Sequence, residues 1–317
     1  MSGGPEAAVV IPTWNSATLL PALLDSLAAQ DVPVELLAVD NGSTDGTVRL
    51  LEERGIPHLT RPRNEGFAVA VNLGVAHTRA PLVMPLNADT ELRPDCITSL
   101  AAALGRDPGL GGVQPRILQV EGATGYPAAA RLYSAGMALT RDGRAFERGA
   151  GEQQVERWSH GREIFGVCGA ACLLRRELFG DLGGYDESYF AFYEDVDLNV
   201  RGRIAGWRFE YVPEAIVWHA GNASWLASSP RPGAWNARLV ARNRIATQAK
   251  FMPLSALPRI LAVEVGSLVR AARQGRLRAT LRGKLEGLAG LPRNLRQRRR
   301  LAAAGDLDAP RAWLGRE

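Results

Sequence analysis

The stretch Leu82-Val83-Met84-Pro85-Leu86-Asn87-Ala88-Asp89 decides the fold class of this chain. Its first part, 82–86, is apolar throughout, which is typical of a strand that a parallel sheet buries on both faces. Asp89 follows three residues after this run. Open α/β sheets bind ligands at the carboxyl ends of their strands, so Asp89 stands where a ligand would bind, with an ordinary loop residue as the alternative.

The segments around this strand alternate between strand and helix signals, as they do in a doubly wound sheet. Ser43-Thr44-Asp45-Gly46 has the residue types that cap a helix, and Asp45 is expected to be only a cap. Strands are expected at 8–11, 34–39, 58–60 and 82–86, and helices at 18–29, 47–54, 67–76 and 95–104.

The second half of the chain follows this alternation less closely. Residues 111–166 are rich in Gly and Pro, and they predict a strand followed by an insertion or a flexible loop. A buried strand is expected at 167–174, a helix at 194–205 and an edge strand at 208–212. From Pro213 onward the α/β alternation stops.

Length and charge predict one large domain with an appendage. The chain has 317 residues, of which 46% are hydrophobic and 22% are charged. Its formal net charge is +5, yet the segment 259–300 holds twelve Arg or Lys and two Glu, about +10, which leaves about −5 for the rest. No RNA-recognition motif interleaves aromatic residues with these arginines, which disfavours binding to nucleic acid.

Cysteine usage and the apolar windows indicate a cytoplasmic protein. Cys96, Cys168 and Cys172 form no Cys-x-x-Cys pair, so reduced core thiols are favoured over a metal or redox site. The first residues show no basic segment ahead of an apolar core, and we expect a protein that is not secreted. The longest apolar window, 251–269, is interrupted by Pro, Arg and Glu and is not expected to span a membrane.

A second acidic element, Tyr193-Glu194-Asp195-Val196-Asp197-Leu198, places three carboxylates at the start of a predicted helix. Carboxylates this close repel one another, so a folded protein keeps them only beside a cation, a polar ligand or open solvent. Neighbouring helix positions do not share a face, so only one carboxylate is expected to meet a ligand, and Asp197 can pair with Arg201 four residues on. This element is predicted to be a reaction centre.

Five motifs occur in order between about Ala8 and Arg244: Val10-Ile11-Pro12-Thr13-Trp14-Asn15, Asp40-Asn41-Gly42-Ser43-Thr44-Asp45-Gly46-Thr47, Asn64-Glu65-Gly66-Phe67 with Asn72, Leu86-Asn87-Ala88-Asp89, and Tyr193-Glu194-Asp195-Val196-Asp197. They resemble the motifs of the family 2 inverting glycosyltransferases, and within that family those of bacterial rhamnosyltransferases and their galactofuranosyl relatives. The resemblance implies the GT-A fold, an α/β, Rossmann-like doubly wound and mostly parallel sheet, here with a helical basic C-terminal extension.

The resemblance implies a pocket for a nucleotide-sugar donor. Asp40 would accept a hydrogen bond from the ring N–H of a pyrimidine, although Asn-Gly-Ser-Thr-Asp segments also cap turns. Thymine and uracil offer the same N–H, so the resemblance leaves dTDP-sugars and UDP-sugars open. Arg242 would contact donor phosphates, or would lie on a solvated helix face. The other residues implied to bind the donor are Pro12, Thr13, Asn15, Asn41, Asn64, Gly66, Phe67, Asn72, Asn87, Ala88 and Asp89.

The resemblance also implies a metal ion and a catalytic base. Asn87-Ala88-Asp89 stands where the family carries Asp-x-Asp, so binding of Mg²⁺ or Mn²⁺ is transferred to Asp89 alone. Asp195 matches the position of the family base, and Glu194 could share that role. His219 is either a further metal ligand or a buried structural histidine.

The implied activity is the metal-dependent transfer of a sugar to a hydroxyl of a cell-envelope glycan or a polyprenyl-linked acceptor. Rhamnose from dTDP-rhamnose is favoured, and a UDP-sugar such as UDP-galactofuranose is the alternative. A silent sugar-nucleotide-binding protein would be expected to lack one acidic element. A nicotinamide-dependent oxidoreductase would carry Gly-x-Gly-x-x-Gly after the first strand. Both acidic elements are present and the glycine motif is absent from the sequence.

We expect a GT-A catalytic domain over 1–235, with a nucleotide-binding half to about residue 110 and an acceptor-binding half from about 111. A basic helical extension is expected over 236–300 and a flexible tail over 301–317. On an anionic membrane surface each Arg of such helices contributes on the order of 1 kcal/mol. The expected location is therefore the inner face of the cell membrane, as a peripheral protein, with a solvated extension as the alternative.

Overall fold

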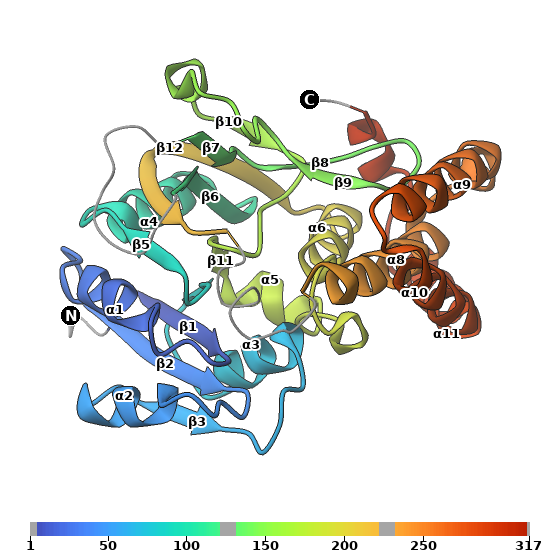
Figure 1. Cartoon of the computed structure of the whole chain (residues 1–317). Helices are drawn as coiled ribbons and strands as arrows, with labels where there is room; N and C mark the ends of the chain where they lie inside the picture. Colours follow the sequence, from blue (N-terminus) through green and yellow to red (C-terminus); the bar gives the residue numbers. More distant parts are fainter. Residues whose placement is uncertain (1–4, 121–130, 222–231, 316–317) are drawn as a thin grey trace.

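The computed structural model describes residues 5–120, 131–221 and 232–315 of the chain. Its centre is a ten-stranded sheet, and four helices near the C-terminal end form a separate layer at one side (Figure 1). Along the main path of the sheet the strands are β10 (Arg162–Ile164), β12 (Arg208–His219), β6 (Leu110–Gln119), β11 (Leu173–Arg175), β4 (Leu82–Pro85), β1 (Ala7–Thr13), β2 (Val34–Asp40) and β3 (His58–Thr60).

The half of the sheet formed by β4, β1, β2 and β3 is parallel, and β4 and nearly all of β1 are buried on both faces. Val9 of β1 belongs to a core cluster that includes residues of α1 (Leu20–Ala28) and α4 (Cys96–Arg106). Val10 belongs to a second cluster, which includes residues of α3 (Phe67–Ala76). Successive strand residues point to opposite faces, so helices cover both sides of this half, as a doubly wound sheet requires.

The predictions for the first half of the chain are confirmed. Each expected strand and helix is present with ends within two residues of those predicted, including α2 (Thr47–Glu53). The N-cap of α2 is Gly46, and Asp45 before it accepts hydrogen bonds from the amide of Thr47, the first helical residue, and from the amide of Ala17, both at 3.0 Å. The α/β fold class and the helical C-terminal region are confirmed as well.

Strand pairing in the second half brings distant parts of the chain to one place. The short strand β5 (Thr90–Leu92) pairs antiparallel with the end of β12, with Thr90 opposite His219. Asp89 immediately precedes β5 in the chain. The pairing therefore places His219 near the end of β4, beside Asp89.

Two strand predictions in this half are wrong. The segment 208–212 is not an edge strand, because β12 continues to His219 and lies between β10 and β6. The predicted strand 167–174 is reduced to Leu173–Arg175, with one isolated bridge at Ala171. Residues 167–170 instead run as a loop whose backbone meets helix side chains, such as Asn199 and Asp195.

The predicted strand within 111–166 is β6, and much of the described insertion after it is regular. It contains β7 (Arg131–Ser134), which pairs with β6, and a hairpin of β8 (Met137–Leu139) and β9 (Ala145–Glu147). Residues 121–130 lie outside the described part of the chain. Of the two alternatives, residues 131–166 fit the insertion, because they contain short strands of their own.

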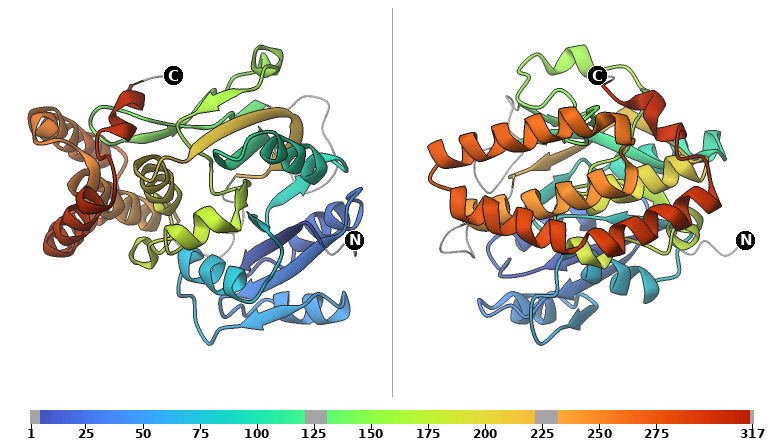
Figure 2. Two further views of the ribbon diagram at one scale, coloured as in Figure 1. Left: turned by 180° about the vertical axis from the view of Figure 1, so that it is seen from behind. Right: turned by 90° about the vertical axis from the view of Figure 1, so that its right-hand side faces the viewer.

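The C-terminal layer consists of α8 (Pro232–Phe251), α9 (Leu257–Arg273), α10 (Leu277–Ala289) and α11 (Leu291–Ala304) (Figure 2). The helix α6 (Glu194–Ile204), which follows α5 (Arg176–Asp181), lies between this layer and the sheet (Figure 1). On α10, Gly283 and Gly287 face the main chain of α8, where a side chain would clash, so the two helices pack closely.

The end of the chain differs from the flexible tail expected for 301–317. Through residue 315 it packs on the α/β part: Gly305 lies against Ile204, and the guanidinium of Arg203 lies 4.2 Å from the ring centroid of Trp313. Residues 316–317 lie outside the described part. Among the described helices, none has both the length and the apolar character that a membrane span needs.

Candidate functional site

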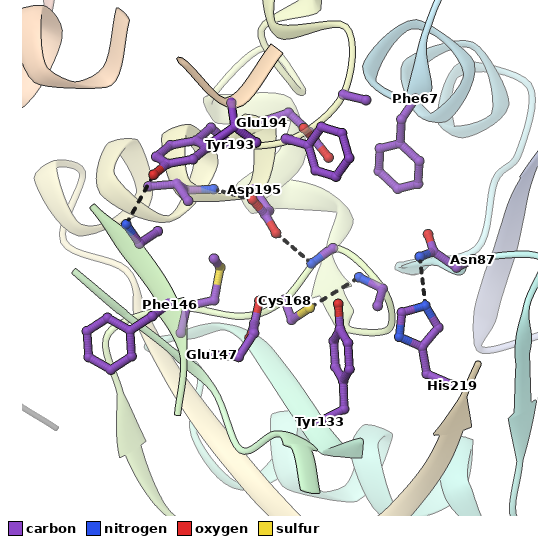
Figure 3. Close-up of a pocket in the computed structure, with 18 residues that line it drawn as sticks. Phe67, Asn87, Tyr133, Phe146, Glu147, Cys168, Tyr193, Glu194, Asp195 and His219 are labelled. Atoms are coloured by element: carbon purple, nitrogen blue, oxygen red, sulfur yellow. Dashed lines mark hydrogen bonds between the residues drawn. The ribbon is translucent and has the colours of Figure 1, made fainter. Parts of the chain in front are cut away.

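A cavity of about 250 Å³ opens beside the start of α6, and we call it the carboxylate cavity. Figure 3 shows Asp195 and Glu147 entering it from opposite walls, with Asn87 and His219 at one end. Its walls come from the end of β4, the start of α3, the loop 168–170, β9, α6 and α8. The site is thus built from parts of the chain that are far apart in sequence.

Glu194 and Asp195 both line the carboxylate cavity, but they point in different directions, as their neighbouring helix positions require (Figure 3). The Asp195 carboxylate accepts hydrogen bonds from the amides of Gly169, at 2.9 Å, and Val196, at 2.8 Å. Glu194 is buried, and its Oε2 has no hydrogen-bond partner among the described residues.

Burial changes the acidity of these two carboxyls. It raises the pKa of Glu194 well above its ordinary value, and the charge of Asp195 raises it further. Burial also raises the pKa of Asp195, although the amide hydrogen bonds act against the rise. Both raised pKa values disfavour two adjacent negative charges, and carboxyls perturbed in this way are typical of acid–base sites.

Asp89 and His219 meet at the end of the cavity. The Asp89 Oδ1 lies 3.2 Å from the His219 Nε2, and both side chains are almost completely buried. The Asn87 side-chain amide lies 3.3 Å from the same ring nitrogen. The structure thus brings together the three residues that the sequence singled out for metal or donor contact.

A second and smaller cavity of about 50 Å³ lies at the ends of β1 and β4, and we call it the strand-end cavity. It shares Phe67 and Asn87 with the carboxylate cavity. Eight of the predicted donor-binding residues line it: Pro12, Thr13, Asn41, Asn64, Phe67, Asn87, Ala88 and Asp89.

Five further predicted donor residues do not line either cavity. Asp40 is fully buried, and its carboxylate accepts hydrogen bonds from the amides of Gly42 and Ser43, both at 3.0 Å, and from the Thr13 hydroxyl at 3.1 Å. Asn15 has a side-chain oxygen that accepts from the Thr44 amide at 2.8 Å. Both therefore hold the loops that shape the strand-end cavity.

The other three residues hold the chain around α3 and the acceptor side. Gly66 has a φ of +99°, and the carbonyl of Phe190 occupies the place of a side chain there. The Asn72 side chain bonds the main chain of Tyr185. Arg242 is half-buried and donates to the carbonyls of Ser188, at 3.0 Å, and Tyr189, at 2.6 Å, so its guanidinium faces the loop instead of lying on a solvated face.

The sequence interpretation missed Glu147 and Tyr133, which both line the carboxylate cavity. Burial and the charge of Asp195 raise the pKa of Glu147 to about 8, although the Ser134 hydroxyl hydrogen-bonds the carboxylate at 2.5 Å. The Tyr133 ring packs edge-on against His219, with centroids 4.5 Å apart. Both lie in the segment 111–166, which carries no motif, so no sequence signal pointed to them.

A family model described as "Glycosyl transferase family 2" matches residues 8–183, more than half of the chain. The chain belongs to glycosyl transferase family 2. Within this family it is 34% identical, over 67% of its own length and 75% of the relative's, to an N-acetylglucosaminyl-diphospho-decaprenol L-rhamnosyltransferase of Mycobacterium tuberculosis. A PGL/p-HBAD biosynthesis glycosyltransferase of Mycobacterium bovis is 30% identical, over 62% of this chain and 69% of that protein.

Solved glycosyltransferases share the fold of this family 2 chain. The structure of GalNAc-T7 with UDP, GalNAc and Mn²⁺ superposes with a TM-score of 0.60 at 19% identity, covering 78% of this chain and 50% of that one. A mannosyltransferase of Pyrobaculum calidifontis in complex with GDP-Man and Mn²⁺ gives 0.54 at 20% identity, covering 95% and 86%. At such identities these structures show the fold alone, and it is the GT-A fold. The glycosyltransferase activity is shown by the family.

Proposed function

We propose that this glycosyltransferase moves rhamnose from a nucleotide sugar, with dTDP-rhamnose favoured, to a hydroxyl of a polyprenyl-diphosphate-linked glycan, with inversion at the anomeric carbon. The observation that supports it best is the pair of adjoining cavities, one with Asp89 and the other with Asp195. Phe67 and Asn87 line both cavities, so a donor in one and an acceptor in the other would meet at these two residues. The choice of sugar and acceptor follows the mycobacterial relative.

The base in this proposal is Asp195. Its two amide hydrogen bonds hold the carboxylate in place and leave it in the cavity wall, where it can accept the proton of the acceptor hydroxyl. Glu194 lies next to it, and burial together with the charge of Asp195 raises the pKa of Glu194 well above its ordinary value. Inversion follows if the hydroxyl attacks the face of the sugar opposite the departing nucleotide.

Asp89 and His219 would hold the divalent metal ion. They fit one, because a carboxylate oxygen and an imidazole nitrogen lie 3.2 Å apart in a buried place, and this mixed donor pair favours Mn²⁺ over Mg²⁺. Among the described residues, no group of three His, Cys, Asp or Glu could hold an ion, so the diphosphate of the donor would complete the coordination. A bound ion would neutralise the charge on the departing nucleotide.

A test compares Asp195→Asn, Glu194→Gln and the wild type for rhamnose transfer from dTDP-rhamnose to a short-chain prenyl diphosphate that carries N-acetylglucosamine. We expect Asp195→Asn to lower kcat by about 10²- to 10⁴-fold while dTDP binding is unchanged, since a general base contributes that much. Near-normal turnover of a folded Asp195→Asn protein would refute the assignment. Transfer from UDP-galactofuranose instead would favour the alternative donor.

The C-terminal layer supports attachment to an anionic membrane. On α9, Leu257, Leu261, Val265 and Val269 recur every four residues and are each at least 50% exposed, and we call them the apolar stripe of α9. The segment 259–300 around the stripe carries about +10. An exposed apolar stripe within basic helices is the pattern of a helix that lies in a membrane interface.

Vesicle flotation tests this attachment. Wild-type protein should float with vesicles that contain phosphatidylglycerol. The variant with Leu261→Asp and Val265→Asp should bind these vesicles at least about 10-fold more weakly, because two apolar side chains no longer enter the interface. The variant with Ala28→Asp and Ala102→Asp, which adds the same charge to exposed sites on α1 and α4, is the control. Equal binding of all three proteins would contradict the proposal.

A further inference from the structure

A third cavity, of about 210 Å³, lies between α8, α9 and the turn before β9, and we call it the arginine cavity. Four arginines are among its lining residues: Arg144, Arg244, Arg270 and Arg276. Val240 of α8 lines both this cavity and the carboxylate cavity. The two cavities therefore adjoin along α8.

The arginine cavity carries excess positive charge. Arg144 pairs with Asp142 at 2.7 Å, and Arg244 pairs with Glu264 at 2.6 Å. Lys284 contacts Glu264 as well. Within the described chain, no carboxylate lies within ion-pairing distance of the other two arginines. The four lining arginines thus have two paired carboxylates between them, and the excess of about two positive charges favours an anionic ligand.

One of these arginines, Arg244, is held in a fixed arrangement. Both nitrogens of the Arg244 guanidinium fork bond the two oxygens of Glu264, at 2.6 and 2.7 Å, and Gln248 donates to Glu264 at 3.0 Å. Both Arg244 and Glu264 are largely buried. A guanidinium held in this way is ordered before a ligand arrives, so little conformational entropy is lost on binding.

Tyr193 connects the arginine cavity to the catalytic carboxylates. It directly precedes Glu194, and its hydroxyl accepts a hydrogen bond from the Ala145 amide at 3.4 Å, next to Arg144. Burial raises the pKa of Tyr193, and the nearby charge of Arg244 acts against that rise. Tyr193 and Ala145 both line the carboxylate cavity. Arg144 of the arginine cavity is therefore adjacent in sequence to Ala145, which lies in the wall of the carboxylate cavity.

We propose that the arginine cavity binds the diphosphate of a lipid-linked acceptor while the acceptor sugar occupies the carboxylate cavity. This inference rests on the proposed function. In such an acceptor the diphosphate is attached directly to the sugar. The two cavities have the matching arrangement, because the arginine cavity adjoins the carboxylate cavity. Arginine forks suit phosphate oxygens, and several can share one diphosphate.

The test compares two soluble acceptors, so that no bilayer is present. One is N-acetylglucosamine on a short prenyl diphosphate, and the other is the same sugar on a short prenyl chain without phosphate. The variant with Arg270→Gln and Arg276→Gln should raise KM for the first acceptor by about 10- to 100-fold, because charged hydrogen bonds are lost. Its kcat/KM for the second acceptor should stay within about twofold of the wild type.

The matched control is the variant with Arg296→Gln and Arg299→Gln, which removes the same charge from exposed positions of α11. It should behave as the wild type with both acceptors. An equal loss with both acceptors in the Arg270/Arg276 variant, or no loss, would overturn the inference. An effect that appears only when anionic vesicles are added would assign these arginines to lipid headgroups instead, and would also overturn it.

A binding measurement separates this inference from the proposed function. Calorimetry follows geranyl diphosphate binding in the presence of a chelator, which removes any metal-dependent binding of diphosphate at Asp89. We expect binding to the wild type and the control variant, and at least 10-fold weaker binding to the Arg270/Arg276 variant. If the wild type binds geranyl diphosphate in this way but transfers no rhamnose, the proposed function fails and the anion site stands. If all three proteins bind equally, the anion site fails.

Discussion

Lys250 joins the C-terminal layer to the catalytic helix, and its replacement by Met tests that connection. Its ammonium group lies 2.6 Å from Asp186 and 2.7 Å from Asp197, and only 2% of the side chain is exposed. Asp197 is on α6, two residues after Asp195, and Asp186 precedes the loop that leads to α6. Lys250→Met should therefore loosen α8 from both elements.

The expected loss of stability follows from the partners that remain. Each lost hydrogen bond to a charged group is worth about 1.5–3 kcal/mol. Both carboxylates keep a guanidinium, since Asp186 bonds Arg293 at 2.7 Å and Asp197 bonds Arg201 at 2.6 Å. The ammonium group also no longer has to be desolvated. We therefore expect a loss of about 2–4 kcal/mol, below the two full hydrogen-bond values combined.

Urea unfolding at pH 7 measures this loss. The control is Arg49→Met, which removes one partner of an exposed pair, Arg49 and Glu53, at 3.6 Å. Exposed pairs contribute about 0–1 kcal/mol, so the control should stay close to the wild type. A loss for Lys250→Met no larger than that of the control would refute the view that this buried lysine fastens α8 to α6.

Two further variants probe the carboxylate cavity. Glu147 has a pKa of about 8 in the folded protein, above that of an exposed carboxyl, so its contribution to stability is fully present at acid pH and is lost as the pH rises toward 8. In the wild type this fall is at most about 1.4 kcal/mol per pH unit, and Glu147→Gln should abolish it. Thermal melts from pH 5 to 9 measure it, and the same dependence of stability on pH in both proteins would contradict the prediction. The Asn243 side-chain amide donates to the carbonyls of Tyr189, Ala191 and Phe192, at 3.0, 2.8 and 2.7 Å. Asn243→Ala should raise KM for the acceptor about 10-fold or more while binding of dTDP with Mn²⁺ is unchanged, and equal changes in both would show a general loss of structure instead.

The parts of the fold that could be predicted are those with local signals. β4 is apolar throughout because both its faces are buried, and Asp89 follows shortly after its carboxyl end, where open α/β sheets bind ligands. In the same way, the pairing of Asp197 with Arg201 at 2.6 Å needs only helix geometry. The order of the residues along the chain was enough to predict both features.

The parts that could not be predicted depend on contacts between distant segments. The pattern at 208–212 gave no indication that β12 runs on to His219 and is covered by β10, because an interior strand and an edge strand can share one sequence pattern. Glu147 enters the carboxylate cavity from a short hairpin strand without any motif. Arg242 has the residue type of a phosphate ligand, yet main-chain carbonyls surround it.

The loop before the catalytic carboxylates explains why α8 matters for the reaction. Phe190, Phe192 and Tyr193 all have positive φ values, between 65° and 72°, and such backbone costs of order 1–3 kcal/mol per non-glycine residue. This strain persists only where other contacts impose it, and the contacts come from Arg242 and Asn243 of α8, which bond four carbonyls of residues 188–192. Tyr193 is the N-cap residue of α6, whose first two residues are Glu194 and Asp195. The C-terminal layer therefore sets the direction of both carboxylates, in addition to any contact that it makes with a membrane.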